Sequence, residues 1–354
     1  MKKEDKIYLA GHTGLVGSAI YRKLQQEGFA NIITRDLKDL NLCSQEAVEK
    51  FFEKEKPDYV ILAAAKVGGI IANSTYPADF IYQNIMIAAN VIHASYKYGV
   101  KKLLNLGSSC IYPKFAPQPM KEDCLLTSEL ESTNEAYAIA KISAIKLCRY
   151  YNEQYGTNFI SVMPTNQYGE GDNFNMETAH LLPMLLRRFH LARLLADKNF
   201  EAITSDLKRY KLGWGLDEKL NLNDQNSIKS VLGDIGAFGD KVVAWGDGSP
   251  YRELMNSDDL ADACFYLMQN KEYKEIGELV NITDGTDIQL KELIEMVKEV
   301  VGFKGEIVYD TTKPNGTPRK LMDATKIKSL GWNPKIELKD GIKKAYDWYK
   351  EQVV

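Results

Sequence analysis

The feature that most constrains the fold is a glycine-rich turn near the start of the chain, in the stretch IYLAGHTGLVGSAI that begins at Ile7. An apolar run precedes the turn and an amphipathic stretch follows it, so it joins a predicted strand to a predicted helix. Its glycines allow a tight turn and close approach to a pyrophosphate, whose charge is favoured by free N–H groups at a helix start. The simpler alternative is a turn that only needs left-handed backbone. We expect a dinucleotide-binding site with contacts from Gly11, Thr13, Gly14, Leu15, Val16 and Gly17.

The rest of the chain alternates apolar runs with amphipathic stretches. Strands are predicted at residues 6–11, 31–34, 58–65, 101–109, 158–166 and 278–283, and helices at 15–28, 44–56, 84–99, 135–154, 180–195 and 257–269. Ser257 or Asp258 is the expected cap of the last of these helices. Continuously apolar strands separated by helices indicate a parallel sheet covered on both faces. We therefore predict an α/β fold, with a Rossmann-like doubly wound parallel sheet and a smaller, mixed α/β substrate-binding domain.

The predicted domains interleave along the chain. The dinucleotide-binding domain is expected to take residues 1–170 and 253–285, and the substrate-binding domain residues 171–252 and 286–354. A charged, asparagine-rich segment at about 194–240 is expected to form a lobe or an insertion within the second domain.

Composition excludes several classes of function. The net charge of −3 gives no electrostatic reason to expect a nucleic acid or a membrane surface as partner. The chain lacks a run of about 20 apolar residues and the apolar region of a secretory signal, so we expect a cytoplasmic protein. Five widely spaced cysteines without a CxxC pair predict reduced thiols, and four histidines without ligand spacing predict no metal site.

The type of dinucleotide depends on the end of the second predicted strand, where an acidic side chain binds a ribose 2′-OH and a basic one accommodates a 2′-phosphate. Arg35 favours NADPH, whereas the adjacent Asp36 argues weakly for NADH. Both side chains are alternatively solvated loop charges. We predict NADPH as the cofactor.

Tyr137 and Lys141 are four residues apart on a predicted helix and therefore share one face of it. An ammonium close to a phenol favours the phenolate, so we expect Lys141 to lower the pKa of Tyr137 towards working pH, as acid–base catalysis requires. An ordinary amphipathic helix gives the same spacing by chance. Ser108 and Ser109 directly follow a predicted strand, where one hydroxyl can share a carbonyl oxygen with Tyr137 and the other can serve as a turn or cap residue.

Seven strings together closely resemble the GDP-L-fucose synthase family, a branch of the extended short-chain dehydrogenases and reductases. They are AGHTGLVGSAI, AAAKVGGI, GSSCIYP, TNEAYAIAKISAIKLC, MPTNQYGEGDNF, AHLLPMLLRRFH and WGDGSPYREL. The resemblance implies bound NADPH and a GDP-linked 4-keto sugar that is epimerised at C3 and C5 and then reduced at C4. It also implies a homodimer built from two helices of each subunit.

The resemblance also implies roles for individual residues. Tyr137 donates a proton to O4, Lys141 holds the cofactor ribose, and Ser108 hydrogen-bonds the carbonyl. Cys110 and His180 are the base and acid of epimerisation, for which the residues alone suggest only a small buried thiol and a helix-capping histidine. Further cofactor contacts are implied for Ala64, Lys141, Pro164, Asn166 and His180. Contacts with the GDP-sugar are implied for Ser109, Asn166, Arg188, Trp245, Arg252 and Asn315.

Three departures from the family pattern bear on these expectations. Thr13 stands where the family often has arginine, which removes a candidate contact to a 2′-phosphate, and Asn315 stands where aspartate is common. The segment at 194–240 is extra, and some relatives with a similarly placed segment act on GDP-linked 4-keto heptoses or only reduce C4. A C4-reductase of a GDP-4-keto heptose is therefore one alternative function, and a non-catalytic NADP-binding regulator is another.

Overall fold

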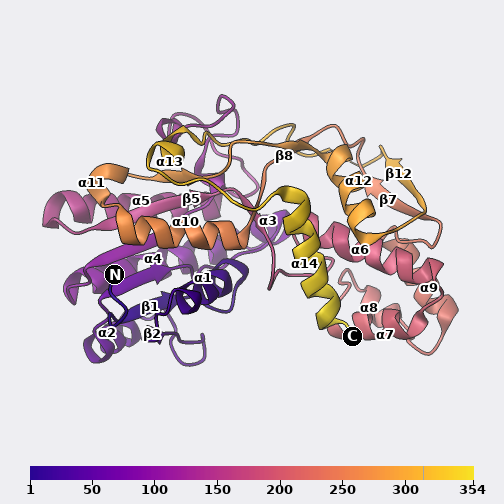
Figure 1. Cartoon of the computed structure of the whole chain (residues 1–354), viewed down its shortest axis with the longest axis horizontal. Helices are drawn as coiled ribbons and strands as arrows, with labels where there is room; N and C mark the ends of the chain where they lie inside the picture. Colours follow the sequence, from indigo (N-terminus) through magenta and orange to yellow (C-terminus); the bar gives the residue numbers. More distant parts are fainter. Residues whose placement is uncertain (314) are drawn as a thin grey trace. The chain divides into compact units, whose positions relative to one another are not determined.

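The computed structural model describes residues 1–313 and 315–354, which form two compact units (Figure 1). Unit 1 comprises residues 1–167, 255–286 and 321–335, and unit 2 comprises residues 168–254, 287–320 and 336–354. No helix among the described residues has the length and apolar character needed to cross a bilayer.

Unit 1 is built on a six-stranded parallel sheet with the strand order β10-β5-β4-β3-β1-β2. Its strands are β1 (Ile7–Ala10), β2 (Ile32–Ile33), β3 (Tyr59–Leu62), β4 (Lys102–Leu106), β5 (Phe159–Pro164) and β10 (Val280–Ile282). Its α-helices are α1 (Leu15–Gln26), α2 (Gln45–Glu55), α3 (Ile70–Thr75), α4 (Pro77–Lys97), α5 (Glu135–Tyr155), α10 (Ser257–Asn270), α11 (Tyr273–Ile276) and α13 (Thr325–Ser329). Two 3-10 helices, η1 (Ser109–Ile111) and η2 (Glu122–Cys124), follow β4. The fold class predicted from the sequence is confirmed.

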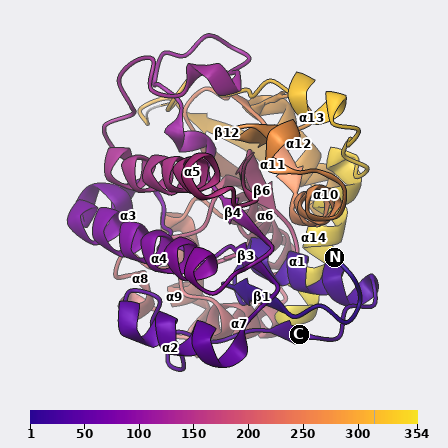
Figure 2. The same cartoon turned by 90° about the vertical axis from the view of Figure 1, so that its left-hand side faces the viewer.

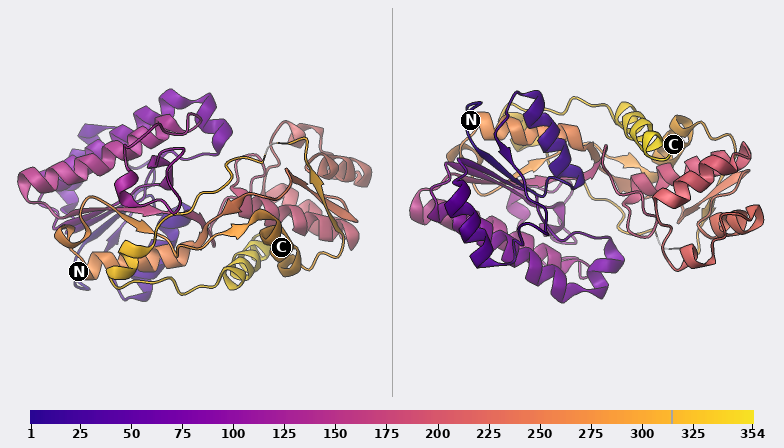
Figure 3. Two further views of the ribbon diagram at one scale, coloured as in Figure 1. Left: turned by 90° about the horizontal axis from the view of Figure 1, so that it is seen from above. Right: turned by 90° about the horizontal axis from the view of Figure 1, so that it is seen from below.

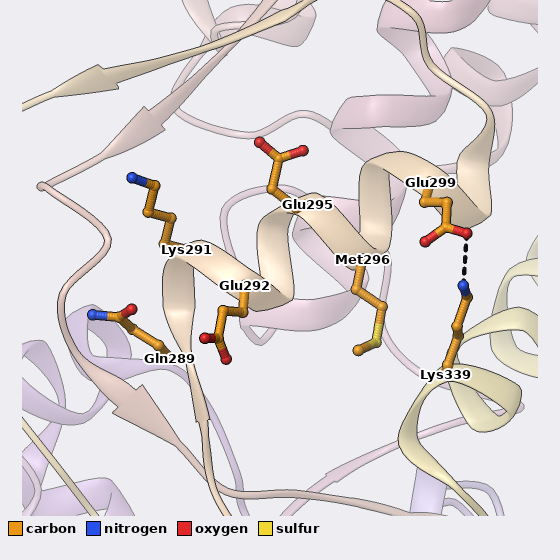
Figure 4. Close-up of a pocket in the computed structure, with 7 residues that line it drawn as sticks. All are labelled: Gln289, Lys291, Glu292, Glu295, Met296, Glu299 and Lys339. Atoms are coloured by element: carbon orange, nitrogen blue, oxygen red, sulfur yellow. Dashed lines mark hydrogen bonds and ion pairs between the residues drawn. The ribbon is translucent and has the colours of Figure 1, made fainter.

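The pleat of β1 explains why helices cover both faces of this sheet. Ile7 and Leu9 pack with apolar residues of α1 and α10, whereas Tyr8 and Ala10 pack with those of α2, α4 and α5. Because alternate side chains of a strand point to opposite faces, a continuous apolar run requires cover on both sides. Figures 2 and 3 show this arrangement, with α4 and α5 side by side on one face and α10 on the other.

The order of the strands also indicates where a ligand can bind to unit 1. The chain runs from β1 outward to β2 on one side, then returns to place β3 on the other side of β1. Helices on either side of such a reversal leave a crevice beyond the carboxyl ends of the strands. The glycine turn follows β1 directly and therefore lies at this position.

Unit 2 is smaller and mixes helices with short sheets. Its helices are α6 (Leu181–Ala196), α7 (Phe200–Arg209), α8 (Leu216–Lys219), α9 (Gln225–Asp234), α12 (Leu290–Val301) and α14 (Leu338–Gln352). Strand β7 (Lys241–Trp245) pairs in parallel with β12 (Glu306–Asp310), and β8 (Tyr251–Arg252) pairs antiparallel with β11 (Ile288–Gln289). Strands β6 (Asn166–Tyr168) and β9 (Leu254–Asn256), where the chain passes between units, pair with each other.

Two details differ from the sequence prediction. The cap of α10 is Asn256, whose side chain accepts the N–H of Asp258, rather than Ser257 or Asp258. Residues 321–335, predicted in the substrate-binding domain, return to unit 1. There the indole N–H of Trp332 donates to Asp262 of α10 at 2.9 Å, a long-range contact that no local pattern indicates.

Candidate active site

The glycine turn in unit 1 is packed so closely that two of its glycines admit no side chain. A Cβ on Gly11 would lie 2.6 Å from the backbone nitrogen of Ala64, and one on Gly17 would lie 1.9 Å from the carbonyl oxygen of Gly11. Gly11 also has a φ of +88°, which favours glycine. A Cβ on Gly14 would have no neighbour closer than 3.7 Å, so that glycine faces open space.

The N-terminus of α1 at this turn has no side-chain cap and no acidic residue in its first turn. Its N–H groups and the positive end of the helix are therefore available to an anion. The open side of Gly14 is where a pyrophosphate can approach the backbone. The turn thus fits a dinucleotide.

His12, inside the same turn, is a further candidate and is one of the four histidines whose spacing indicates no metal site. Its Nε2 lies 3.6 Å from the carboxylate of Asp36, and its buried Nδ1 has no hydrogen-bond partner among the described residues. Arg35 is engaged by Glu55, whose carboxylate lies 2.8 Å from Nη2. The position of His12 between two glycines of the turn was the available signal. The unpartnered nitrogen of His12 suits a ribose hydroxyl or a phosphate, whereas the Asp36 carboxylate suits a ribose hydroxyl.

Tyr137 and Lys141 lie one turn apart on α5, as their spacing predicted, and Lys141 reaches the carboxyl end of β4. The Lys141 ammonium lies 5.7 Å from the centroid of the Tyr137 ring and donates to the carbonyl oxygen of Leu106 at 2.7 Å. Cys110 is 7% exposed in η1 and interacts electrostatically with both groups. A phenol, an ammonium and a thiol therefore meet at the end of one strand.

The expected electrostatic effect of Lys141 on Tyr137 is wrong for this structure. Burial raises the pKa of Tyr137 above its ordinary value, because the phenolate is desolvated, and the negative charge of Cys110 adds to the increase. Burial lowers the pKa of Lys141 to about 8, although the charge of Cys110 acts in the opposite direction. The phenol is thus held protonated and suits a proton donor.

The two serines at the end of β4 differ in role. The hydroxyl oxygen of Ser108 accepts the backbone N–H of Cys110 at 3.5 Å and caps η1, while Ser109 is 7% exposed. A hydroxyl that accepts one hydrogen bond still has its own hydrogen to donate. Ser108 can therefore cap the helix and donate to a carbonyl oxygen. Pro164 ends the adjacent strand β5, and Asn166 is exposed in β6.

Unit 2 contains the other predicted site residues, beginning with two on α6. His180 is the exposed N-cap of this helix, and desolvation by nearby protein atoms lowers the pKa of its imidazole. Arg188 is 3% exposed and donates from Nη1 to the carbonyl oxygen of Val243 at 3.0 Å. Its Nε has no hydrogen-bond partner within the described part of the chain. A buried guanidinium with an unused donor suits an anionic ligand.

The remaining predicted substrate residues gather beyond the end of β7. The indole of Trp245 is 56% exposed, and the next residue, Gly246, packs against Asn315, whose side-chain oxygen accepts the N–H of Asp247 at 2.8 Å. Arg252 donates to the carbonyl oxygen of Thr317 at 2.7 Å. The Lys313 ammonium lies 5.6 Å from the centroid of the Trp245 ring. An exposed aromatic face and nearby cations are suited to a nucleotide. No cluster of potential metal ligands occurs among the described residues.

The glycine turn on a parallel sheet and the Tyr137–Lys141 pair define a class: dinucleotide-dependent enzymes of the Rossmann type. Residues 7–208 and 218–283 match the NAD dependent epimerase/dehydratase family. The chain belongs to this family, and within it to the GDP-L-fucose synthase group.

We compare the chain with three similar proteins. The putative GDP-L-fucose synthase 2 of Arabidopsis thaliana is 54% identical over 354 residues, which cover all of this chain and 94% of the relative. A GDP-D-glycero-L-gluco-heptose synthase from Campylobacter jejuni, crystallised in the presence of NADPH, is 43% identical, with a TM-score of 0.91 and 99% of both chains covered. A GDP-mannoheptose C4 reductase from the same organism, with NADP bound, is 44% identical, with a TM-score of 0.87 and 99% of both chains covered.

Proposed function

We propose that the chain is an NADPH-dependent enzyme that epimerises a GDP-4-keto-6-deoxy sugar at C3 and C5 and then reduces it at C4. The observation that carries this proposal is the meeting of Tyr137, Lys141 and Cys110 at the carboxyl end of β4. The likeness to GDP-L-fucose synthases supports the substrate class. We expect the protein to act in the cytoplasm, on a GDP-linked sugar.

Epimerisation uses the acidity that a 4-keto group gives to hydrogens on both neighbouring carbons. Inversion needs a base on one face of the sugar and an acid on the other. We assign the base to the Cys110 thiolate, which an adjacent lysine ammonium favours. We assign the acid to His180, whose lowered pKa makes its imidazolium a stronger proton donor.

Reduction needs a proton at O4 and a hydride at C4. NADPH supplies the hydride when it is bound. Tyr137 donates the proton, because its raised pKa keeps the phenol protonated. The Ser108 hydroxyl donates a hydrogen bond to the same oxygen, and the Lys141 ammonium stabilises the phenolate that remains. GDP is held by Arg188, Trp245, Arg252 and Asn315.

Replacing Tyr137 by Phe tests the reductase assignment. Loss of the proton donor should lower kcat for NADPH oxidation by about 10²- to 10⁴-fold, while NADPH affinity remains unchanged. Tyr76→Phe, which removes an exposed hydroxyl elsewhere in unit 1, is the matched control. Unaltered turnover in Tyr137→Phe would exclude this residue as the acid. Absence of turnover in the wild type, with NADPH binding intact, would favour the non-catalytic regulator.

A C4-reductase of a GDP-4-keto heptose is the second candidate function. Its support is the match of two Campylobacter jejuni heptose enzymes across 99% of this chain, which includes the segment at 194–240. A single reaction mixture that contains NADPH, the 6-deoxyhexose and the heptose substrate separates the two. Product masses that show preferential turnover of the 6-deoxyhexose support the leading proposal, and preferential turnover of the heptose supports the second.

We further propose that the protein is a homodimer that pairs through α4 and α5. These helices lie side by side on one face of the sheet (Figure 2), and four of their tyrosines are exposed. Tyr82, Tyr96, Tyr150 and Tyr155 are 62%, 37%, 54% and 46% exposed. Aromatic side chains concentrated on one face are characteristic of interfaces.

A further inference from the structure

The inserted lobe of unit 2, defined as residues 194–240, contains a strained turn between α7 and α8. Gly213, Trp214 and Gly215 have φ angles of +81°, +49° and +68°, so three consecutive residues adopt left-handed backbone. For a bulky residue such as tryptophan this conformation is rare and costs about 1–3 kcal/mol. It persists only where the surrounding structure enforces it.

Two carboxylates enforce this turn. Asp217 accepts the N–H groups of Leu212 and Gly213 at 3.1 and 2.7 Å. Glu177 accepts the N–H of Trp214 at 3.2 Å. Glu177 also lies so close to Gly213 that a Cβ on this glycine would be 2.4 Å from the Cβ of Glu177. The turn is therefore fixed against the segment to which Glu177 belongs.

That segment leads directly to His180, the acid assigned above. Glu177 is three residues before His180. Further hydrogen bonds join the segment around Glu177 to the end of the turn at Lys211. Met176 donates its N–H to the carbonyl oxygen of Lys211 at 3.3 Å, and the buried guanidinium of Arg187 donates to the carbonyl oxygens of Phe174 and Lys211. The turn is thus bound to residues 174–177, which shortly precede His180 in the chain.

The Trp214 side chain is only partly covered by the rest of the protein. Its indole is 42% exposed, so a large part of its surface is accessible to a ligand. Residues 209–217 also fall outside the match to the wider family, which covers 7–208 and 218–283. The turn is therefore a feature that general members of the family do not need for their fold.

We propose that Trp214 is a specificity-determining residue whose indole forms an apolar platform for the sugar of the nucleotide-sugar. This inference rests on the proposed function, because it places the sugar beside His180. The C–H face of a pyranose packs well on an aromatic ring, and a strained backbone held by two carboxylates keeps that ring in position.

Trp214→Gly separates the side chain from the backbone, because glycine accepts the left-handed conformation without strain. Relief of the backbone strain offsets part of the packing lost with the covered half of the indole, so we expect this variant to remain folded with only a modest fall in melting temperature. Its affinity for GDP-mannose, measured by calorimetry, should fall by about 2- to 10-fold while its affinity for GDP is unchanged. Trp214→Tyr, which retains an aromatic face, should restore most of the affinity for GDP-mannose.

The outcomes distinguish this inference from the proposed function. If the wild type binds GDP-mannose more tightly than GDP and Trp214→Gly keeps the same preference, the role of Trp214 is overturned and the proposed function stands. An equal loss of affinity for GDP and GDP-mannose in the variant also overturns it. A wild type that binds neither ligand overturns the proposed function and this inference together.

Discussion

Lys141 is the residue of the candidate site most constrained by its surroundings, because its ammonium is buried against a backbone carbonyl at the end of β4. Burial lowers its pKa from 10.5 to about 8. Between these values the unfolded chain holds a proton that the folded chain lacks, so this group makes folding more favourable as pH rises through that window. Below about pH 8, Lys141 is charged although it is buried, which destabilises the folded protein but places a cation beside Tyr137.

The lowered pKa of Lys141 predicts how the reaction rate depends on pH. We expect kcat/KM for NADPH-dependent reduction to fall as pH rises through about 8, because Lys141 then loses the charge that stabilises the phenolate. A pH–rate profile checks this. In Lys141→Arg, which stays charged throughout, the decrease should disappear even if activity is lower. A wild-type profile that stays flat through this pH would contradict the role of Lys141.

At this scale, spacing predicted that Tyr137 and Lys141 share a helix face, the family resemblance added Cys110, and neither predicted the pKa shifts. The four-residue separation brought Tyr137 and Lys141 to one face of α5, and the end of β4 brought Ser108 beside Cys110. The sign of the pKa shift of Tyr137 depends on how deeply its hydroxyl is buried by distant segments. His12 was not predictable as a site residue, because its role depends on its contact with Asp36 in the folded chain.

At the scale of elements, the turn between β1 and α1 contains glycines with two different roles, one in packing and one in leaving room for a ligand. Gly17 is needed for packing, since its Cβ would overlap the carbonyl oxygen of Gly11, whereas Gly14 faces open space with an ordinary φ of −79°. A turn that is only structural would need Gly17 and not Gly14. A turn that binds a pyrophosphate needs both.

Two substitutions test this distinction. Gly17→Ala should lower the free energy of unfolding by about 1–3 kcal/mol, because the added methyl group overpacks the turn. Gly14→Ala, which replaces the N-cap glycine of α1, should lower it by less than about 1 kcal/mol and yet weaken NADPH binding, because the methyl group occupies the space of the pyrophosphate. Denaturant unfolding and NADPH titration measure the two quantities. Normal NADPH affinity in Gly14→Ala would argue against a pyrophosphate there.

The strands and long helices of unit 1 were predictable because each has a strong apolar pattern of its own. The elements of the inserted lobe were not, since α7 is fixed by a long-range interaction. Its Asp206 is fully buried and paired with Arg187 of α6 at 2.8 Å. A charged residue at a buried position looks like a surface residue in the sequence, so the segment was predicted only as a charged lobe.

At the scale of the whole molecule, the proposed dimer depends on the aromatic face of α4 and α5. Introducing charge there should separate the subunits, because a buried unpaired carboxylate is costly. We expect sedimentation velocity to show a dimer for the wild type and a monomer for Tyr150→Glu combined with Tyr155→Glu. Leu37→Glu, at a residue that is 77% exposed on another part of unit 1, is the matched control. A wild type that sediments as a monomer would contradict the dimer.

The most direct test of the central claim is a reaction of the wild type with NADPH and GDP-4-keto-6-deoxymannose in deuterated water, with the product examined by mass spectrometry and NMR. One chain that performs both chemistries should release a C4-reduced sugar that carries solvent deuterium at C3 and C5. In Cys110→Ser, deuterium uptake at C3 and C5 should slow more than reduction of an already epimerised substrate. A reduced wild-type product without deuterium at either carbon would contradict the account.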